Sequence, residues 1–215
     1  MPTTSMAEAL YRNAKPCKAV NCNIPRRNLG GYCRDHWRKA YVYGHPNGRS
    51  IRRKEYQREL NDVITLFNAN PEHAGLLAAT AWLDGLLYKA SQGRAMVGCN
   101  LFRRLNTYGI TGKKILIECS AIWLFSQRNL NTLDDDVRLT YALALVTLRL
   151  MPNERRTSWT SGREYSLKVP SSKVKAIGKS FRSTLCLFFG RVAQTMLQQD
   201  LEANKLKEAF FEPFQ

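Results

Sequence analysis

Four residues near the start of the chain have the types and the spacing of a metal site. Cys17, Cys22, Cys33 and His36 follow the pattern Cys-x4-Cys-x10-Cys-x2-His. Three thiolates and one imidazole are the donor set that tetrahedral Zn²⁺ prefers, and four protein ligands leave no open position on the ion. The alternative is a set of ordinary buried cysteines beside an unrelated histidine. Because all four donors fall within twenty residues, we predict a structural zinc site with no catalytic role.

The sequence around these ligands fits a compact metal-binding loop. The stretch Asn28-Leu-Gly-Gly supplies residues that tolerate the left-handed backbone of a tight turn. Cys33 and His36 are one helical turn apart, so both can face one ion from the start of a helix. We expect Trp37 to pack behind the metal, because so small a module has few other residues to form a core. His45, in a Gly-His-Pro turn, is left outside the ligand set.

A basic segment with interleaved aromatic residues accompanies the ligands. Arg34 and Arg38 are four residues apart, as are Trp37 and Tyr41, so a helix here would carry adjoining basic and aromatic stripes. Such a surface contacts phosphates with its charges and packs or stacks with its rings. A solvated basic face is the alternative. The residues predicted to bind nucleic acid are Arg26, Arg27, Arg34, Arg38, Lys39, Arg49, Arg52, Arg53 and Lys54.

The run Cys-x4-Cys…Gly-x-Cys-x2-His-Trp-Arg…Tyr-Gly-His-Pro resembles the small zinc-binding module of many bacteriophage proteins, often found at the N-terminus of HNH endonucleases. The resemblance covers about residues 16–48. In that family the turn after the helix usually has Asp where this chain has His45. The resemblance implies a zinc finger that attaches to nucleic acid in a phage-encoded or phage-like protein, and by itself implies no catalysis.

Charge is concentrated at the N-terminal end of the chain. Of the formal net charge of +16, residues 1–54 contribute +10, from 12 Lys or Arg and 2 Asp or Glu, and the rest contributes +6, from 21 and 15. A basic end of this kind indicates a polyanion partner. No signal peptide opens the chain, and no apolar run reaches the ~18 residues of a membrane span. We therefore expect a protein of the cytoplasm (the host cytoplasm if phage-encoded) with no membrane partner.

The rest of the sequence predicts a mainly α protein, in which a small N-terminal zinc-binding module is followed by a helical domain with one β-hairpin. The domain boundaries are set at residues 1–50 for a lead and the module, 51–205 for the helical domain and 206–215 for an aromatic tail. Beyond the module, apolar residues recur at helical spacing. The helices are expected in the lead at 5–14, and then at about 56–67, from an Asn70-Pro-Glu cap to about 93, at 101–108, around 115–125, from a capping box at 132–135 to 151, and from 170 to 196.

Several features of this helical domain have alternative interpretations. Residues 155–159 and 163–169 around Ser161-Gly162 predict a basic hairpin with Trp159 near its tip. Residues 101–125 have a helix-turn-helix outline, although the second helix is too apolar to lie in a groove. Basic residues after the hairpin could contact DNA or form a solvated face; they are Lys173, Lys175, Lys179 and Arg182. The Phe-rich end, 206–215, either docks a partner or covers the core.

We predict no enzymatic activity. Apart from His36, the histidines are His45 and His73, and neither lies in the pattern of an HNH catalytic site. The sequence therefore predicts a non-enzymatic nucleic-acid-binding protein, with DNA favoured over RNA and a regulatory role in view. The alternatives are a factor that docks its basic surface on an acidic host protein or assembly, and a degenerate HNH-type nuclease. The oligomeric state is left open.

Overall fold

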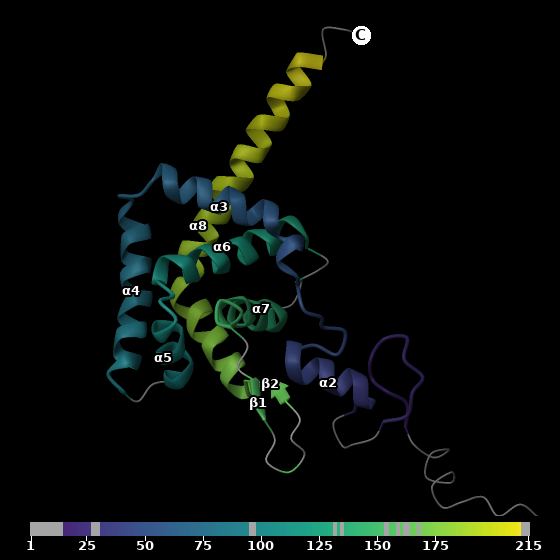
Figure 1. Cartoon of the computed structure of the whole chain (residues 1–215). Coiled ribbons are helices and arrows are strands. Elements are labelled where there is room, and N and C mark those ends of the chain that lie inside the picture. The colour runs from purple at the N-terminus through teal and green to yellow at the C-terminus, as the bar shows by residue number, and fades with distance from the viewer. Residues whose placement is uncertain are drawn as a thin grey trace, which may run out of the picture. The chain divides into compact units, whose positions relative to one another are not determined.

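The computed structural model is mainly helical and describes residues 15–26, 31–94, 98–130, 133, 136–152, 155–157, 160, 164–166 and 169–211, with backbone only for 155–157, 164–166 and 205–211. The chain divides into two compact units, Met1–Ser50 and Ile51–Gln215, here called the N-terminal unit and the helical unit. The helix expected in the lead lies outside the described residues. The elements, labelled in Figure 1, are α2 (Arg34–Tyr43), a 3-10 turn η1 (Arg53–Glu55), α3 (Gln57–Ala69), α4 (Ala74–Ser91), α5 (Cys99–Thr107), α6 (Gly112–Arg128), α7 (Asp136–Leu148), β1 (Arg155–Thr157), β2 (Glu164–Ser166) and α8 (Ser171–Phe211).

The N-terminal unit consists of a loop and one short helix. Pro16 and Pro25 form an isolated antiparallel bridge that closes the loop. Helix α2 follows and ends at Gly44, whose φ of 76° and N–H bond to the Ala40 carbonyl terminate the last turn. None of the ten residues of α2 is buried. The helix is therefore not held by an apolar face of its own.

The helical unit is built around α6. This helix packs against α3, α4, α7 and α8, and most of its residues are buried, including Ile115, Leu116 and Ile122. Thr111 caps its N-terminus by accepting a hydrogen bond from the N–H of Lys114 at 3.3 Å. Because α6 is enclosed by other helices, the helix-turn-helix alternative for residues 101–125 is wrong: its second helix cannot enter a DNA groove.

Helices α7 and α8 cross at a very close approach. A Cβ at Gly178 of α8 would lie 1.9 Å from the carbonyl oxygen of Thr140 in α7. No side chain fits there, so the crossing depends on glycine. Farther along α8, a Cβ at Gly190 would meet nothing within 4 Å. Phe181 and Phe189 of α8 are fully buried and pack against Trp82 and Trp123.

Two ion-pair clusters, each centred on a buried charged side chain, join distant parts of the helical unit. Arg128 pairs with Asp62 and Asp200 at 2.6 Å each and with Glu59 at 3.4 Å, although its side chain is only 10% exposed. Elsewhere Glu118, also buried, accepts a hydrogen bond from the Tyr56 hydroxyl and pairs with Arg53. Burial and the contact with Glu118 raise the pKa of Tyr56 well above its ordinary value. Buried charges are tolerated only when paired in this way.

Two expectations about the ends of elements need correction. Asn70 does not cap α4; its side chain donates to the Leu66 carbonyl at the end of α3, and His73 caps α4 by accepting from the N–H of Gly75. The predicted β-hairpin is not supported in its expected extent. Three residues pair on each side, from Arg155 opposite Ser166 to Thr157 opposite Glu164, while the turn and Trp159 lie outside the described residues.

Helix α8 is much longer than the sequence pattern predicts. It contains 41 residues and continues to Phe211, so the backbone of the first part of segment 206–215 is helical. Figure 1 shows its C-terminal half extending past α3. The capping box expected at 132–135 falls mostly outside the described residues. Of the helices that the structure describes, none combines the length and apolarity needed to cross a membrane.

Candidate metal centre

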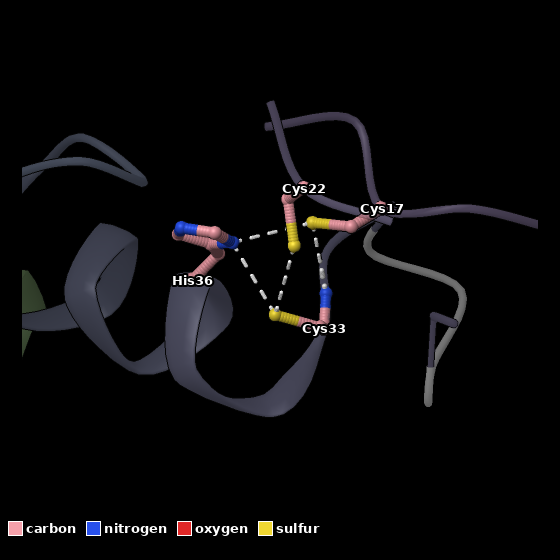
Figure 2. A group of neighbouring side chains, drawn as sticks. All are labelled: Cys17, Cys22, Cys33 and His36. Carbon is pink, nitrogen blue, oxygen red and sulfur yellow. Dashed lines mark hydrogen bonds between the residues drawn. The ribbon is translucent and has the colours of Figure 1, made fainter. Parts of the chain in front are cut away.

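The structure brings the four sequence-predicted ligands together. The donor atoms of Cys17, Cys22, Cys33 and His36 all lie within 4.8 Å of one another. Nδ1 of His36 is 3.5 Å from the Cys17 sulfur and 3.3 Å from the Cys33 sulfur, and the sulfurs of Cys22 and Cys33 are 3.9 Å apart. Figure 2 shows the three sulfurs and this ring nitrogen pointing into a common centre. All six cysteines of the chain are free thiols, and the four donors of this cluster could hold a metal ion.

Backbone hydrogen bonds hold the loop ligands in place. The N–H of Cys17 bonds to the Ile24 carbonyl at 3.0 Å, and the N–H of Cys22 bonds to the Ala19 carbonyl at 3.2 Å, which closes a tight turn between the first two ligands. Asn21 lies in this turn with a φ of 59°, a conformation that asparagine tolerates better than most residues. The turn therefore points both thiols to one side.

Helix α2 supplies the other two ligands from its first turn. Cys33 is the residue before the helix, with extended backbone, and His36 follows one turn later. Gly31, with a φ of 82°, directs the chain into this position, while Asn28, Leu29 and Gly30 of the expected turn lie outside the described residues. The helix start thus converts an i, i+3 spacing into two donors on one face, as the sequence predicts.

The environment favours the thiolate at Cys17 in particular. Burial opposes ionisation, but the N–H groups of Cys33 and Ala19, at 3.2 and 3.4 Å from the sulfur, together with His36 and Cys22 lower the pKa of Cys17 to about 6. At Cys22 an N–H from Ile24 favours the thiolate, but burial and the neighbouring cysteines outweigh it and raise the pKa. A cation in the centre would favour the thiolate form of all three cysteines.

The other two histidines have structural contacts of their own. Nδ1 of His45 accepts a hydrogen bond from the N–H of Asn47 at 3.1 Å and so fixes the turn after α2. Nδ1 of His73 caps α4. The metal-ligating cluster found among the described residues does not include either of them.

The residues predicted to bind nucleic acid are distributed over both units. Arg34, Arg38 and Lys39 are exposed together on α2. Arg26 instead donates from Nε to the Pro16 carbonyl at 2.7 Å and braces the loop, and Arg49 bonds to the Ser50 carbonyl at 3.4 Å. Arg27 lies outside the described residues. The last three residues of the set, Arg52, Arg53 and Lys54, belong to the helical unit and are exposed. Arg53 pairs with Glu118 at 3.3 Å.

Trp37 does not pack behind the metal as expected. Its side chain is 45% exposed and stacks on Tyr41, which is 49% exposed, with ring centroids 5.4 Å apart and an interplanar angle of 17°. The expectation was wrong because the centre of the module is formed by the ligands themselves. Its buried residues in the described part are Cys17, Ala19 and Cys33, with Cys22 and Tyr32 packed against them.

A basic groove on the helical unit is the other surface of interest. It has a volume of about 620 Å³ and lies where α6, α7 and α8 meet, with Lys175, Lys179 and Arg182 along one side. Arg182 is already paired with Asp136 at 2.5 Å. The two lysines are exposed, so the groove is a less concentrated basic surface than α2.

Comparison of the chain with protein-family models, curated proteins and solved structures gives no match.

Proposed function

We propose that the four-ligand cluster is a structural Zn²⁺ site. In a tetrahedral zinc centre with Zn–S of about 2.3 Å and Zn–N of about 2.0–2.1 Å, sulfur atoms lie about 3.8 Å apart and sulfur and nitrogen about 3.6 Å apart. Here the sulfurs of Cys22 and Cys33 are 3.9 Å apart, Nδ1 of His36 is 3.3 and 3.5 Å from the sulfurs of Cys33 and Cys17, and all four donor atoms lie within 4.8 Å of one another. A donor set rich in thiolate also favours zinc over the hard cations Mg²⁺ and Ca²⁺.

We further propose that the N-terminal unit is a non-enzymatic nucleic-acid-binding module. The observation that carries this proposal is the organisation of α2. His36 and the preceding Cys33 face the metal centre, while Arg34, Arg38 and Lys39 are exposed on a helix with no buried residue. A helix with no buried residue has faces available for a partner, and three exposed cations on it match a polyanion.

DNA is favoured as the polyanion by the resemblance of residues 16–48 to phage modules that accompany HNH endonucleases. The same resemblance supports a phage-like origin. The roles of the three histidines support a binding function rather than hydrolysis. His36 belongs to the cluster, and His45 and His73 accept backbone hydrogen bonds that shape a turn and a helix start. A histidine acting as a general base would have to be directed at a substrate proton.

The metal is tested by elemental analysis of protein purified without chelator. We expect one zinc ion per chain. Chelation should release this ion and make the Cys17, Cys22 and Cys33 thiols reactive toward a thiol reagent, in addition to any reactive thiols of the helical unit. Absence of stoichiometric zinc, or an unchanged number of reactive thiols after chelation, would rule out the zinc site.

The partner is tested by comparing nucleic acid with acidic protein. Zinc-loaded protein should retard DNA in a gel at low salt, the complex should dissociate as salt is raised, and metal-stripped protein should bind more weakly. Retention of a host protein with no retention of DNA would instead favour the protein-interaction alternative.

A further inference from the structure

We propose that the stacked pair Trp37–Tyr41 is a platform for unpaired nucleobases, so that the N-terminal unit binds single-stranded nucleic acid in preference to duplex. This inference rests on the proposed nucleic-acid-binding function and specifies its substrate class.

The two rings form a short stack in which the side chain of Trp37 is nearly half exposed. Their centroids are 5.4 Å apart and their planes differ by 17°. The rings are therefore stacked with an offset, each covering part of one face of the other, and exposures of 45% for Trp37 and 49% for Tyr41 leave nearly half of each residue in contact with solvent. A base that joins such a stack adds a further layer to it without any rearrangement of the helix.

Trp37 differs from the other tryptophans that the structure describes. Trp82 and Trp123 are half-buried and pack against Phe181 and Phe189 of the core. Trp37 has only Tyr41 as a ring partner among the contacts described here, and it lies on a helix with no buried residue. Core formation therefore does not account for a large aromatic side chain at this position.

The rings share one face of α2 with two of its cations. At about 100° per residue, Trp37, Tyr41, Arg34 and Arg38 fall within an arc of about 100° around the helix. His36, which faces the sulfurs, lies about 150° from the middle of this arc. The aromatic–basic face is therefore turned away from His36. The proposed zinc site holds the helix through His36 and the preceding Cys33, and the two rings lie on the face turned away from His36.

This combination matches single-stranded nucleic acid better than it matches a duplex or an apolar protein surface. In a duplex the base faces are already stacked on one another, so rings on a rigid helix reach only the backbone. An apolar protein surface would bury Arg34 and Arg38 without counter-charges, which is unfavourable. A single strand offers base faces to the rings and phosphates to the cations at once, which is how sequence-tolerant single-strand binders work.

The proposal is tested with Trp37→Leu in the zinc-loaded full chain. The probes are a labelled oligothymidylate of ~12 nucleotides and a duplex of the same length. Wild type should bind the single strand more tightly. The substitution should weaken single-strand binding roughly 5- to 150-fold, the loss expected for one stacked base, and duplex binding by less than about threefold. Trp37→Phe, which keeps a ring, should recover most of the loss.

Two controls separate a lost platform from a damaged module. Tyr88→Leu removes an aromatic side chain that is 64% exposed on α4 and should change neither affinity. The zinc content of Trp37→Leu should stay at one ion per chain.

An oligouridylate probe shows whether RNA uses the same platform, and a preference for the single strand with either sugar supports the proposal. The platform proposal is overturned if the wild type binds duplex as tightly as or more tightly than the single strand, or if Trp37→Leu loses the same affinity for both probes. Either result leaves nucleic-acid binding itself in place. No binding of any probe contradicts the proposed function as well.

Discussion

Replacing Cys33 with alanine should unfold the N-terminal unit and leave the helical unit folded. The Cys33 thiol is 2% exposed and lies 3.3 Å from Nδ1 of His36 and 3.9 Å from the Cys22 sulfur. Its own N–H also bonds to the Cys17 sulfur. The substitution removes one donor of four and empties the middle of the small cluster of buried residues.

The expected effect is large because, at the proposed zinc site, a metal ion takes the place of an apolar core. A structural zinc site contributes about 10–16 kcal/mol of apparent binding free energy, which equals or exceeds the total stability of most domains, about 5–15 kcal/mol. The buried apolar residues in the described part of this unit are Cys17, Ala19 and Cys33, and two of these are ligands. Burial of so little apolar surface cannot hold α2 in place once a ligand is lost.

Limited trypsin digestion with mass spectrometry measures this outcome. Cleavage after Arg34, Arg38 and Lys39 should accelerate at least about tenfold in Cys33→Ala, because local unfolding exposes the backbone of α2. The melting temperature of the helical unit should change by less than about 2 °C. Cys186→Ala, which removes a half-buried thiol from α8, is the control and should leave the cleavage pattern unchanged. If α2 stays protected in Cys33→Ala, the metal does not hold the unit together.

Three further predictions concern the helical unit. Gly178→Ala should destabilise this unit by about 1–3 kcal/mol in urea unfolding, because the new methyl group overlaps the Thr140 carbonyl. The control, Gly190→Ala on the same helix, should be neutral or stabilising by up to about 1 kcal/mol. Equal effects of the two substitutions would contradict the close crossing of α7 and α8. Arg128→Met should cost about 1–3 kcal/mol, because it leaves the buried carboxylate of Glu59 without its cationic partner, next to Asp62 and Asp200, which are 29% and 32% exposed and partly screened by water. A neutral result would show that Glu59 is solvated as well. Burial raises the pKa of the Cys119 thiol from 9.0 to about 12. The stability that comes from burying the neutral thiol is therefore complete below about pH 9 and is lost as the pH rises toward 12. Over that interval the unfolding free energy of Cys119→Ala should decrease less than that of the wild type, and identical pH profiles would refute the assignment.

The candidate metal ligands could be predicted from the sequence because their chemistry is local. Cys33 and His36 are one helical turn apart, and Cys17 and Cys22 flank a short turn, so residue type and spacing were sufficient. The helices could be predicted for a similar reason, because apolar residues at helical spacing mark the buried faces of α3, α6 and α8.

The errors arose where contacts distant in sequence decide the structure. Asn70 was expected to cap α4, but its side chain returns to α3 and His73 takes the cap. The length of α8 beyond residue 196 depends in part on Asp200, which pairs with Arg128 and Arg58 of other helices. Trp37 was assigned to a core that a metal-centred unit does not need. None of these outcomes has a local sequence signal.

The most direct test of the proposed function is the salt dependence of nucleic-acid affinity after charges are removed from α2. In Arg34→Ala/Arg38→Ala/Lys39→Ala, which keeps all four ligands, the log–log slope should shrink by about two to three units if these side chains contact duplex phosphates. The matched control is Lys173→Ala/Lys175→Ala/Lys179→Ala, which removes the same charge from exposed positions of α8 and should leave the slope within about half a unit. If the α2 variant retains the wild-type affinity and slope with zinc bound, the proposal that this unit binds nucleic acid is wrong.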